Sequence, residues 1–172
     1  MKIAVITGAS SGLGREYAFE TANCRRELDE IWLIARREDK LKEVAEQISK
    51  KVRILPLDIT KEDCIKEYAS LLSDLKPEVS LLINNAGFGR LGNFDELNAE
   101  DNGGMVRLNC ESLTVITSVT LPFMKENSEI INTCSIAAFA PNTRMAVYCS
   151  TKAYVFSLSK ALRSELKSRK IN

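Results

Sequence analysis

The chain has 172 residues, 45% of them hydrophobic and 27% charged, and its 24 basic and 23 acidic residues leave a net charge of +1. This length predicts one globular core, and the balanced charge indicates neither a nucleic-acid partner nor an anionic membrane partner. The apolar run at the N-terminus ends at Thr7, too early for a signal peptide or a membrane span, so a cytoplasmic protein is predicted. The five cysteines form no CxxC pair and histidine is absent, which predicts reduced packing residues and no metal site.

Short apolar segments and amphipathic segments alternate along the whole chain. The apolar segments predict strands near residues 2–7, 31–35, 52–58, 79–85 and 129–134. Stripes with three- and four-residue spacing between them, such as Leu41, Val44 and Ile48, indicate helices. The alternation predicts an α/β fold: a Rossmann-type doubly wound parallel sheet flanked by helices, in a single domain over residues 1–172.

Pro56 falls within the third predicted strand. Because proline cannot donate to a central ladder, this strand is expected at the outer edge of a sheet with the order 3-2-1-4-5.

The glycine pair at 103–104 lies where a long helix is expected. Each glycine would cost roughly 1 kcal/mol in a helix interior. The helix is therefore predicted to begin near Met105, with Asp101 or Asn102 as its cap.

The first predicted strand runs directly into the glycine-rich turn Gly8-Ala9-Ser10-Ser11-Gly12-Leu13-Gly14. A strand, a glycine turn and a helix start together indicate a phosphate cradle. Gly8 would permit the tight turn, Gly12 would let the backbone approach a pyrophosphate, and Gly14 would allow helix and strand to pack closely. The spacing G-x-x-x-G-x-G differs from the common G-x-G-x-x-G, and a glycine turn without a ligand is the alternative.

Tyr148 and Lys152 stand four residues apart in Tyr148-Cys149-Ser150-Thr151-Lys152. On a helix they share a face, so the ammonium can favour the ionised phenol. At about 5 Å and an effective dielectric of about 20, the attraction is roughly 3 kcal/mol, or about 2 pKa units. The pair therefore indicates an acid/base device, although an aromatic ring packed on an aliphatic stem is the simpler alternative.

In this order the motifs resemble the short-chain dehydrogenase/reductase family, in the form with TGxxxGxG, NNAG and a Ser, Tyr-x-x-x-Lys site. The separation of 13 residues between Ser135 and Tyr148 is similar to that of the family. The resemblance covers essentially the whole chain and rests on Thr7 to Gly14, Asp58, Asn84-Asn85-Ala86-Gly87, Asn109, Ser135, Tyr148 and Lys152.

The end of the second predicted strand bears on the choice of cofactor. An NAD-binding unit usually places an acid there, whereas this chain has Arg36-Arg37, with Arg36 22 residues after Gly14. A guanidinium can bind a 2′-phosphate, so NADP is predicted over NAD, and Ser10 or Ser11 could add a hydroxyl. A solvated charge pair before the helix is the alternative.

Other cofactor contacts are implied by the resemblance alone. Asp58 would bind the adenine amino group, and Asn85, Ala86 and Gly87 would lie beside the adenosine ribose. The alternatives are that Asp58 or Thr60 caps the next helix, and that the pair 84–85 only ties the sheet together.

The family's chemistry would make this chain an NADP(H)-dependent oxidoreductase that transfers a hydride between nicotinamide and a small-molecule carbonyl or alcohol substrate. Tyr148 would be the acid or base, and Ser135 would bind the substrate oxygen. Lys152 would lower the Tyr148 pKa and bind the nicotinamide ribose, and Asn109 would hold a water in a relay to Lys152.

Two segments are expected to contact the substrate, residues 88–94 and 138–145. They are mixed apolar sequences that include Arg90 and Arg144, which suits an apolar or weakly anionic carbonyl compound. Both arginines being simply solvated is the alternative.

Family members normally continue beyond the Lys152 helix into two further strands, so the resemblance implies a truncated chain or a fragment that lacks the last strands of the fold. Residues 170–172 would begin the sixth strand, leaving the fifth as an unpaired apolar edge.

Two other functions compete with the reductase. One is a catalytically inactive dinucleotide-binding fragment. The other is an epimerase or dehydratase of the related extended type, which the TGxxxGxG spacing disfavours. By resemblance, a homo-oligomer is expected through the helices around 105–125 and 148–169.

Overall fold

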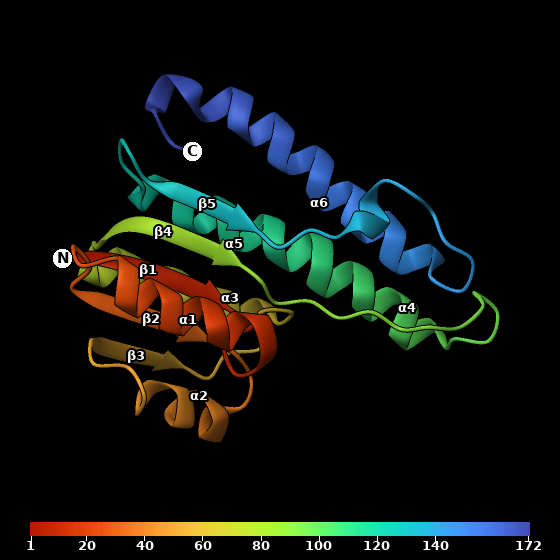
Figure 1. Ribbon diagram of the computed structural model, residues 1–172, viewed down its shortest axis with the longest axis horizontal. Helices are drawn as coiled ribbons and strands as arrows, with labels where there is room; N and C mark the ends of the chain where they lie inside the picture. The colour runs from red at the N-terminus through yellow and green to blue at the C-terminus, as the bar shows by residue number, and fades with distance from the viewer.

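Five parallel strands form one sheet in the order β3-β2-β1-β4-β5 in the computed structural model, which describes residues 1–172 (Figure 1). This is the strand order predicted from the sequence. The strands are β1 Lys2–Thr7, β2 Glu30–Ile34, β3 Lys51–Leu55, β4 Glu78–Asn84 and β5 Glu129–Asn132.

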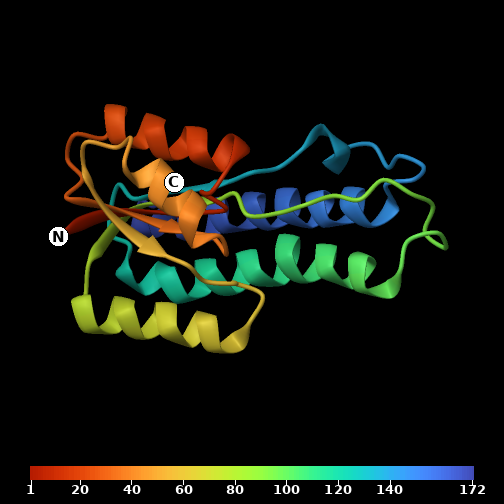
Figure 2. The same ribbon diagram turned by 90° about the horizontal axis from the view of Figure 1, so that it is seen from below.

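Helices cover both faces of the sheet, so the predicted doubly wound fold is confirmed (Figure 2). α4, a π-helical segment at Arg107–Ser112 and α5 follow one another directly as a single long rod (Figure 1). The helices are α1 Gly12–Cys24, α2 Glu38–Ala45, α3 Glu62–Leu75, α4 Ala99–Val106, α5 Leu113–Thr120 and α6 Ala146–Glu165.

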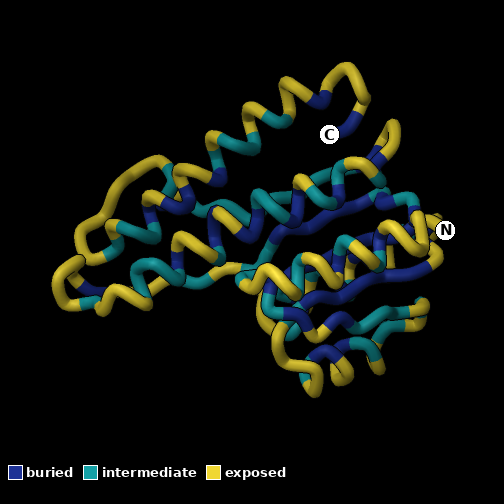
Figure 3. The backbone as a smooth tube through the Cα atoms, turned by 180° about the vertical axis from the view of Figure 1, so that it is seen from behind, coloured by how far each residue is buried: buried dark blue, intermediate teal, exposed yellow.

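The core has two halves because neighbouring strand residues point to opposite faces of the sheet. Ile3 and Val5 of β1 pack with α3 and α5 on one face, while Ala4 and Ile6 pack with α1 and α2 on the other. The central strands are accordingly buried along their length, whereas much of α6 is exposed (Figure 3). Two apolar layers therefore hold the strand ends in place.

β3 lies at the sheet edge, as its proline predicted, but the strand is shorter than expected. It ends at Leu55, so Pro56 follows the strand instead of lying within it. The amide of Leu57 turns back to the carbonyl oxygen of Leu55 at 2.8 Å. Because Pro56 has no N–H to continue the ladder, the pairing stops there.

The predicted start of the long helix near Met105 is wrong. α4 begins at Ala99, and its cap is Asn98, whose side-chain oxygen accepts a hydrogen bond of 2.7 Å from the Asp101 amide. The glycine pair at 103–104 therefore lies inside the helix. At Gly104 the small residue has a packing reason, since a Cβ there would approach the Phe88 ring to 3.3 Å.

The outer edge of β5 is not wholly unpaired, which corrects the prediction made from the sequence. Ile130 donates to the carbonyl oxygen of Asn172 at 2.7 Å, and Asn172 donates to Ser128 at 3.0 Å. Asn172 thus pairs with the start of β5 as residues 170–172 were expected to.

No helix of the structure is both long enough and apolar enough to cross a lipid bilayer.

Candidate active site

A cleft of about 830 Å³ lies at the carboxyl ends of the strands, where open α/β sheets bind their ligands. Segments that follow all five strands contribute to its wall. Of the residues predicted from the sequence, those that line it are Gly8, Ser10, Ser11, Leu13, Arg36, Asp58, Asn85, Ala86, Gly87, Tyr148 and Lys152. Gly12, Gly14, Asn109 and Ser135 are not among the lining residues.

The glycine turn after β1 is held by contacts that leave no room for side chains. Gly8 has φ of +68°, and a Cβ on it would lie 2.8 Å from the Cα of Ala86. A Cβ on Gly14 would overlap the Gly8 carbonyl oxygen. Gly12 also has positive φ, but the space around it is open. Gly8 and Gly14 therefore close the turn, and Gly12 presents bare backbone where α1 begins, the geometry that suits a phosphate.

Thr7, the last residue of β1, holds the ends of β1 and β4 together. Its hydroxyl oxygen accepts hydrogen bonds from the amides of Asn85 at 3.0 Å and Ala86 at 3.1 Å. The Asn85 amide group reaches the Thr7 and Gly8 carbonyl oxygens at 3.4 Å, and its oxygen accepts from Thr133. Asn85 therefore ties three strand ends together and also lines the cleft.

Asn84 has the sheet-tying contacts that the sequence left as an alternative. Its side-chain amide donates to Thr117 of α5 and to Asn132 of β5, both at 2.9 Å, and the residue is buried.

Arg37 contacts the two serines of the glycine turn. Its guanidinium donates to Ser11 at 2.9 Å and to Ser10 at 3.2 Å. In the sequence, Arg36 is the arginine that stands at the usual distance from Gly14. Both arginines line the cleft, so the segment after β2 supplies it with two guanidinium groups.

Asp58 follows β3, the strand next to β2, and accepts hydrogen bonds from Thr60, 2.7 Å from the hydroxyl and 3.1 Å from the amide. Burial acts to raise the pKa of Asp58, but these hydrogen bonds and the charges of Arg36 and Lys61 outweigh it and lower the pKa. Neither Asp58 nor Thr60 caps α3, since the cap position is Lys61 and has no side-chain bond. Asp58 is therefore held as a carboxylate within the cleft.

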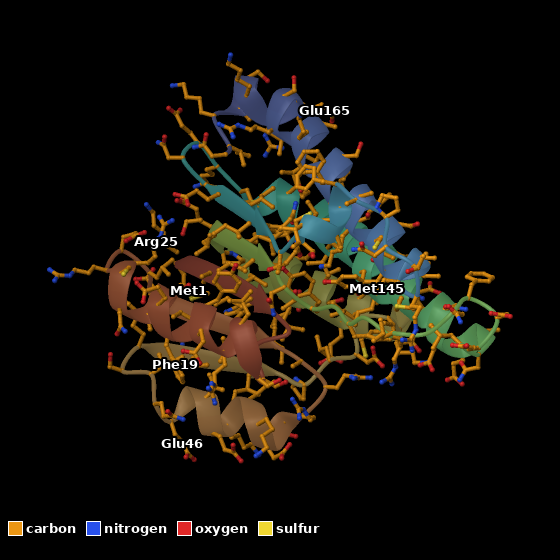
Figure 4. The ribbon with its side chains drawn as sticks, turned by 45° about the vertical axis from the view of Figure 1, so that its right-hand side comes forward. Met1, Phe19, Arg25, Glu46, Met145 and Glu165 are labelled. Atoms are coloured by element: carbon orange, nitrogen blue, oxygen red, sulfur yellow. The ribbon has the colours of Figure 1, made fainter.

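α6 places Tyr148 and Lys152 on one face, one turn apart, as the spacing predicted. Figure 4 marks the ends of this helix with Met145 and Glu165, so the pair lies in its first turns. The Lys152 nitrogen is 5.8 Å from the centre of the Tyr148 ring and donates to the Thr133 carbonyl oxygen at 2.8 Å. Lys152 is only 7% exposed, and burial lowers its pKa.

Ser135 follows β5 and caps a short turn, Ile136–Ala138, by accepting a 3.2 Å hydrogen bond from the Ala137 amide. Its side chain is half-buried beside Cys134, which does line the cleft. The Ala137 amide occupies one acceptor position of the Ser135 oxygen, and the hydroxyl hydrogen donates to no protein group, so it is available to another acceptor.

Asn109 lies in the π-helical segment and is 1% exposed. Its side-chain oxygen accepts from the Phe88 amide at 3.0 Å, and its nitrogen donates to the Phe88 carbonyl oxygen at 2.9 Å and to the Thr151 hydroxyl at 3.0 Å. These bonds use both hydrogens of the amide. The water relay to Lys152 stays a prediction, while Phe88 and Thr151 are contacts that no sequence motif indicated.

The two segments expected to contact substrate meet beside Tyr148. Gly92 donates to the carbonyl oxygen of Arg144 at 2.9 Å, and Arg90 pairs with Asp101 at 3.2 Å. Leu91 and Phe94 in the first segment are 65% and 67% exposed. Two exposed side chains of the first segment are therefore large and apolar, and its single arginine is already paired with a carboxylate.

A parallel sheet in this order, with a glycine turn opening α1 beside a long cleft, defines a dinucleotide-binding protein of the Rossmann type. A family model described as short chain dehydrogenase matches residues 2–172, and the chain belongs to this family. The resemblance identified from the motifs is thus confirmed. The enzyme class is confirmed at the level of the family: NAD(P)-dependent dehydrogenases and reductases acting on CH–OH and C=O groups.

Known proteins agree with this assignment. The chain is 35% identical over 173 residues to an NADP-dependent 3-hydroxy acid dehydrogenase of Schizosaccharomyces pombe, covering 95% of this chain and 65% of that protein. A short-chain dehydrogenase from Sphingobium yanoikuyae, solved with NADPH, superposes with a TM-score of 0.86 at 30% identity, over 99% of this chain and 68% of the other. A short-chain dehydrogenase/reductase from Burkholderia phymatum, solved with NAD, superposes with a TM-score of 0.89 at 28% identity, over 99% of this chain and 63% of the other.

The chain spans between 47% and 71% of the length of the curated relatives. The two solved neighbours named above were determined with NADPH and with NAD, so a nicotinamide dinucleotide is the cofactor class that they support.

Proposed function

We propose that this chain uses NADP(H), in preference to NAD(H), to interconvert a small-molecule carbonyl compound and its alcohol. The carrying observation is the arginine pair after β2. Arg36 and Arg37 both line the cleft there, and Arg37 is bonded to Ser10 and Ser11. Guanidinium and hydroxyl groups suit a 2′-phosphate, while the acid that would bind a ribose diol is absent from this position.

The residues present fit a dinucleotide along its whole length. Gly12 offers open backbone at the start of α1 for a pyrophosphate. Asp58 is a hydrogen-bond acceptor suited to the adenine amino group, and Asn85, Ala86 and Gly87 line the stretch between. Tyr148 and Lys152 line the opposite end, where the nicotinamide ribose would bind.

The cofactor, when bound, supplies or accepts the hydride. Tyr148 would protonate the substrate oxygen in reduction and remove its proton in oxidation. Ser135 would donate its hydroxyl hydrogen, which donates to no protein group, to the same substrate oxygen. Lys152, anchored to Thr133, would place a positive charge beside the Tyr148 ring.

The exposed apolar side chains of Leu91 and Phe94 favour a substrate with an apolar body. An anionic substrate is less suited, since Arg90 already pairs with Asp101.

A second candidate is a module that binds the dinucleotide without turnover. The observation that favours it is the position of Ser135, which is not among the residues lining the cleft. Homo-oligomerisation through segments 105–125 and 148–169 also stays a proposal, which light scattering on the purified chain would test.

Fluorescence titration of the chain with NADPH and, separately, with NADH tests the proposal. Tighter binding of NADPH is expected, followed by NADPH oxidation with at least one compound from a panel of apolar ketones and aldehydes. Equal affinities would contradict the cofactor preference. Tight NADPH binding with no oxidation across the panel would favour the binding module.

A further inference from the structure

The hydroxyl of Thr151 lies between the two helical rods that carry the site. Thr151 is 2% exposed and is on α6, between Tyr148 and Lys152. It donates to the Tyr148 carbonyl oxygen at 2.8 Å and accepts from the Asn109 side chain at 3.0 Å. One buried hydroxyl thus joins the first turns of α6 to the π-helical segment.

Asn109 passes this connection to the segment after β4. Its side-chain amide bonds both backbone groups of Phe88, at 3.0 Å to the nitrogen and 2.9 Å to the oxygen. Two opposed bonds to one residue fix both the position and the rotation of that backbone unit. A Cβ on neighbouring Gly87 would lie 3.0 Å from the Asn109 oxygen, so Asn109 fits closely here.

Gly89 completes the connection, because it lies against the ring of Tyr148, the residue whose carbonyl oxygen Thr151 bonds. A Cβ on Gly89 would lie 2.8 Å from Cδ2 of the Tyr148 ring, so the Gly89 backbone lies directly against that ring. The circuit runs from the Tyr148 carbonyl through Thr151, Asn109 and Phe88 to Gly89 and back to the Tyr148 side chain.

We propose that Thr151 is a positioning residue: through Asn109, its hydroxyl holds the Phe88–Gly89 backbone against the Tyr148 ring. These contacts do not depend on the proposed function, whereas the effect of Thr151 on turnover rests on it. Without the hydroxyl, one N–H of a 1% exposed amide has no partner. An unsatisfied buried donor is costly, so the Asn109 side chain would lose one of the bonds that fix its orientation and would hold Phe88 less firmly.

The experiment is NMR spectroscopy of the 172-residue chain with and without NADPH, measuring exchange of the Phe88 amide and the ring resonances of Tyr148. Thr151→Val keeps the shape and removes the hydroxyl, whereas Thr151→Ser keeps the hydroxyl. A matched control is Thr114→Val, because the Thr114 hydroxyl also joins α5 to α6, through Tyr154 at 2.7 Å, but does not contact Phe88.

In Thr151→Val we expect Phe88 amide exchange to be roughly ten-fold faster, the effect of one lost hydrogen bond, and the Tyr148 ring resonances to shift. Thr151→Ser and Thr114→Val should match the wild type at both sites. Unchanged Phe88 exchange and an unchanged Tyr148 ring in a folded Thr151→Val chain would overturn the proposal. Should that variant not fold, Thr151→Ala gives the same comparison without a branched side chain.

Where the chain turns over substrate, Thr151→Val should lower kcat with little change in KM or in the NADPH dissociation constant, and Thr151→Ser should restore it. A chain without turnover that still shows faster Phe88 exchange would contradict the proposed function while supporting the positioning role.

Discussion

The Lys152 ammonium donates a 2.8 Å hydrogen bond to the carbonyl oxygen of Thr133, the first residue after β5. The bond ties α6 to the end of the sheet and brings a positive charge into a place that is almost closed to solvent. Burial disfavours that charge and lowers the pKa of Lys152 from its ordinary value of 10.5. Tertiary structure has thus imposed an electrostatic cost on this residue.

This cost predicts a pH dependence of stability. Below the folded-state pKa of Lys152, both the folded and unfolded chains hold the proton. Between that pKa and 10.5, the unfolded chain holds a proton that the folded chain has released, so the free energy of unfolding rises with pH. Urea unfolding of wild type and Lys152→Met should be measured across this window. The free energy of unfolding of the wild type should rise with pH relative to that of the variant. If the free energies of unfolding of the two proteins changed with pH in the same way, the lowered pKa of Lys152 would be contradicted.

The arginine pair predicts cofactor specificity. Arg36→Asp and Arg37→Asp should each weaken NADPH binding roughly ten- to hundred-fold, the loss of one charge-assisted hydrogen bond of about 1.5–3 kcal/mol. NADH binding should be kept or improved. Lys40→Asp is the matched control, because it makes the same charge change on α2 and is not among the residues lining the cleft. An unaltered NADPH to NADH ratio in both arginine variants would mean that the pair is only surface charge.

The acid/base role predicts the effect of removing one hydroxyl. Tyr148→Phe should lower kcat by about 10²- to 10⁴-fold, the usual contribution of a positioned proton donor. NADPH affinity should change little, because the ring stays in place beside Gly89. Tyr154→Phe controls for loss of a phenol from the same helix, since its hydroxyl bonds Thr114. Turnover rates and NADPH titrations on both variants measure this, and full activity in Tyr148→Phe would refute the assignment.

The glycine turn predicts losses of different size at two of its positions. Gly14→Ala should destabilise the fold strongly and abolish cofactor binding, because the new methyl group would overlap the Gly8 carbonyl and crowd the Asn85 amide. Gly12→Ala has open space and should cost only about 1–2 kcal/mol for its left-handed backbone. Thermal unfolding with and without NADPH separates the two effects. Similar losses in both variants would contradict the close packing assigned to Gly14.

The sequence by itself determined the sheet order, the edge position of β3 and the pairing of Tyr148 with Lys152 on one helical face. The alternating apolar segments, the proline and the i, i+4 spacing are short-range patterns, and the strand order follows from the Rossmann topology that they indicate. The start of α4 was predicted wrongly for the same local reason. Helix propensity disfavours the glycines at 103–104 within a helix. The Asn98 cap and the packing of the Phe88 ring against Gly104 instead set the start of α4 before them.

Only the tertiary structure decided which groups the site residues contact. It directs Arg37 to the serines of the turn, bonds Asn109 to Phe88 and Thr151, and anchors Lys152 to Thr133. Arg37 and Ser11 are 26 residues apart in the chain, and Asn109 and Thr151 are 42 apart. The physical reason is that the sheet and its helices bring such residues together, and hydrogen-bonding partners are settled only when every buried donor and acceptor competes for the groups within its reach.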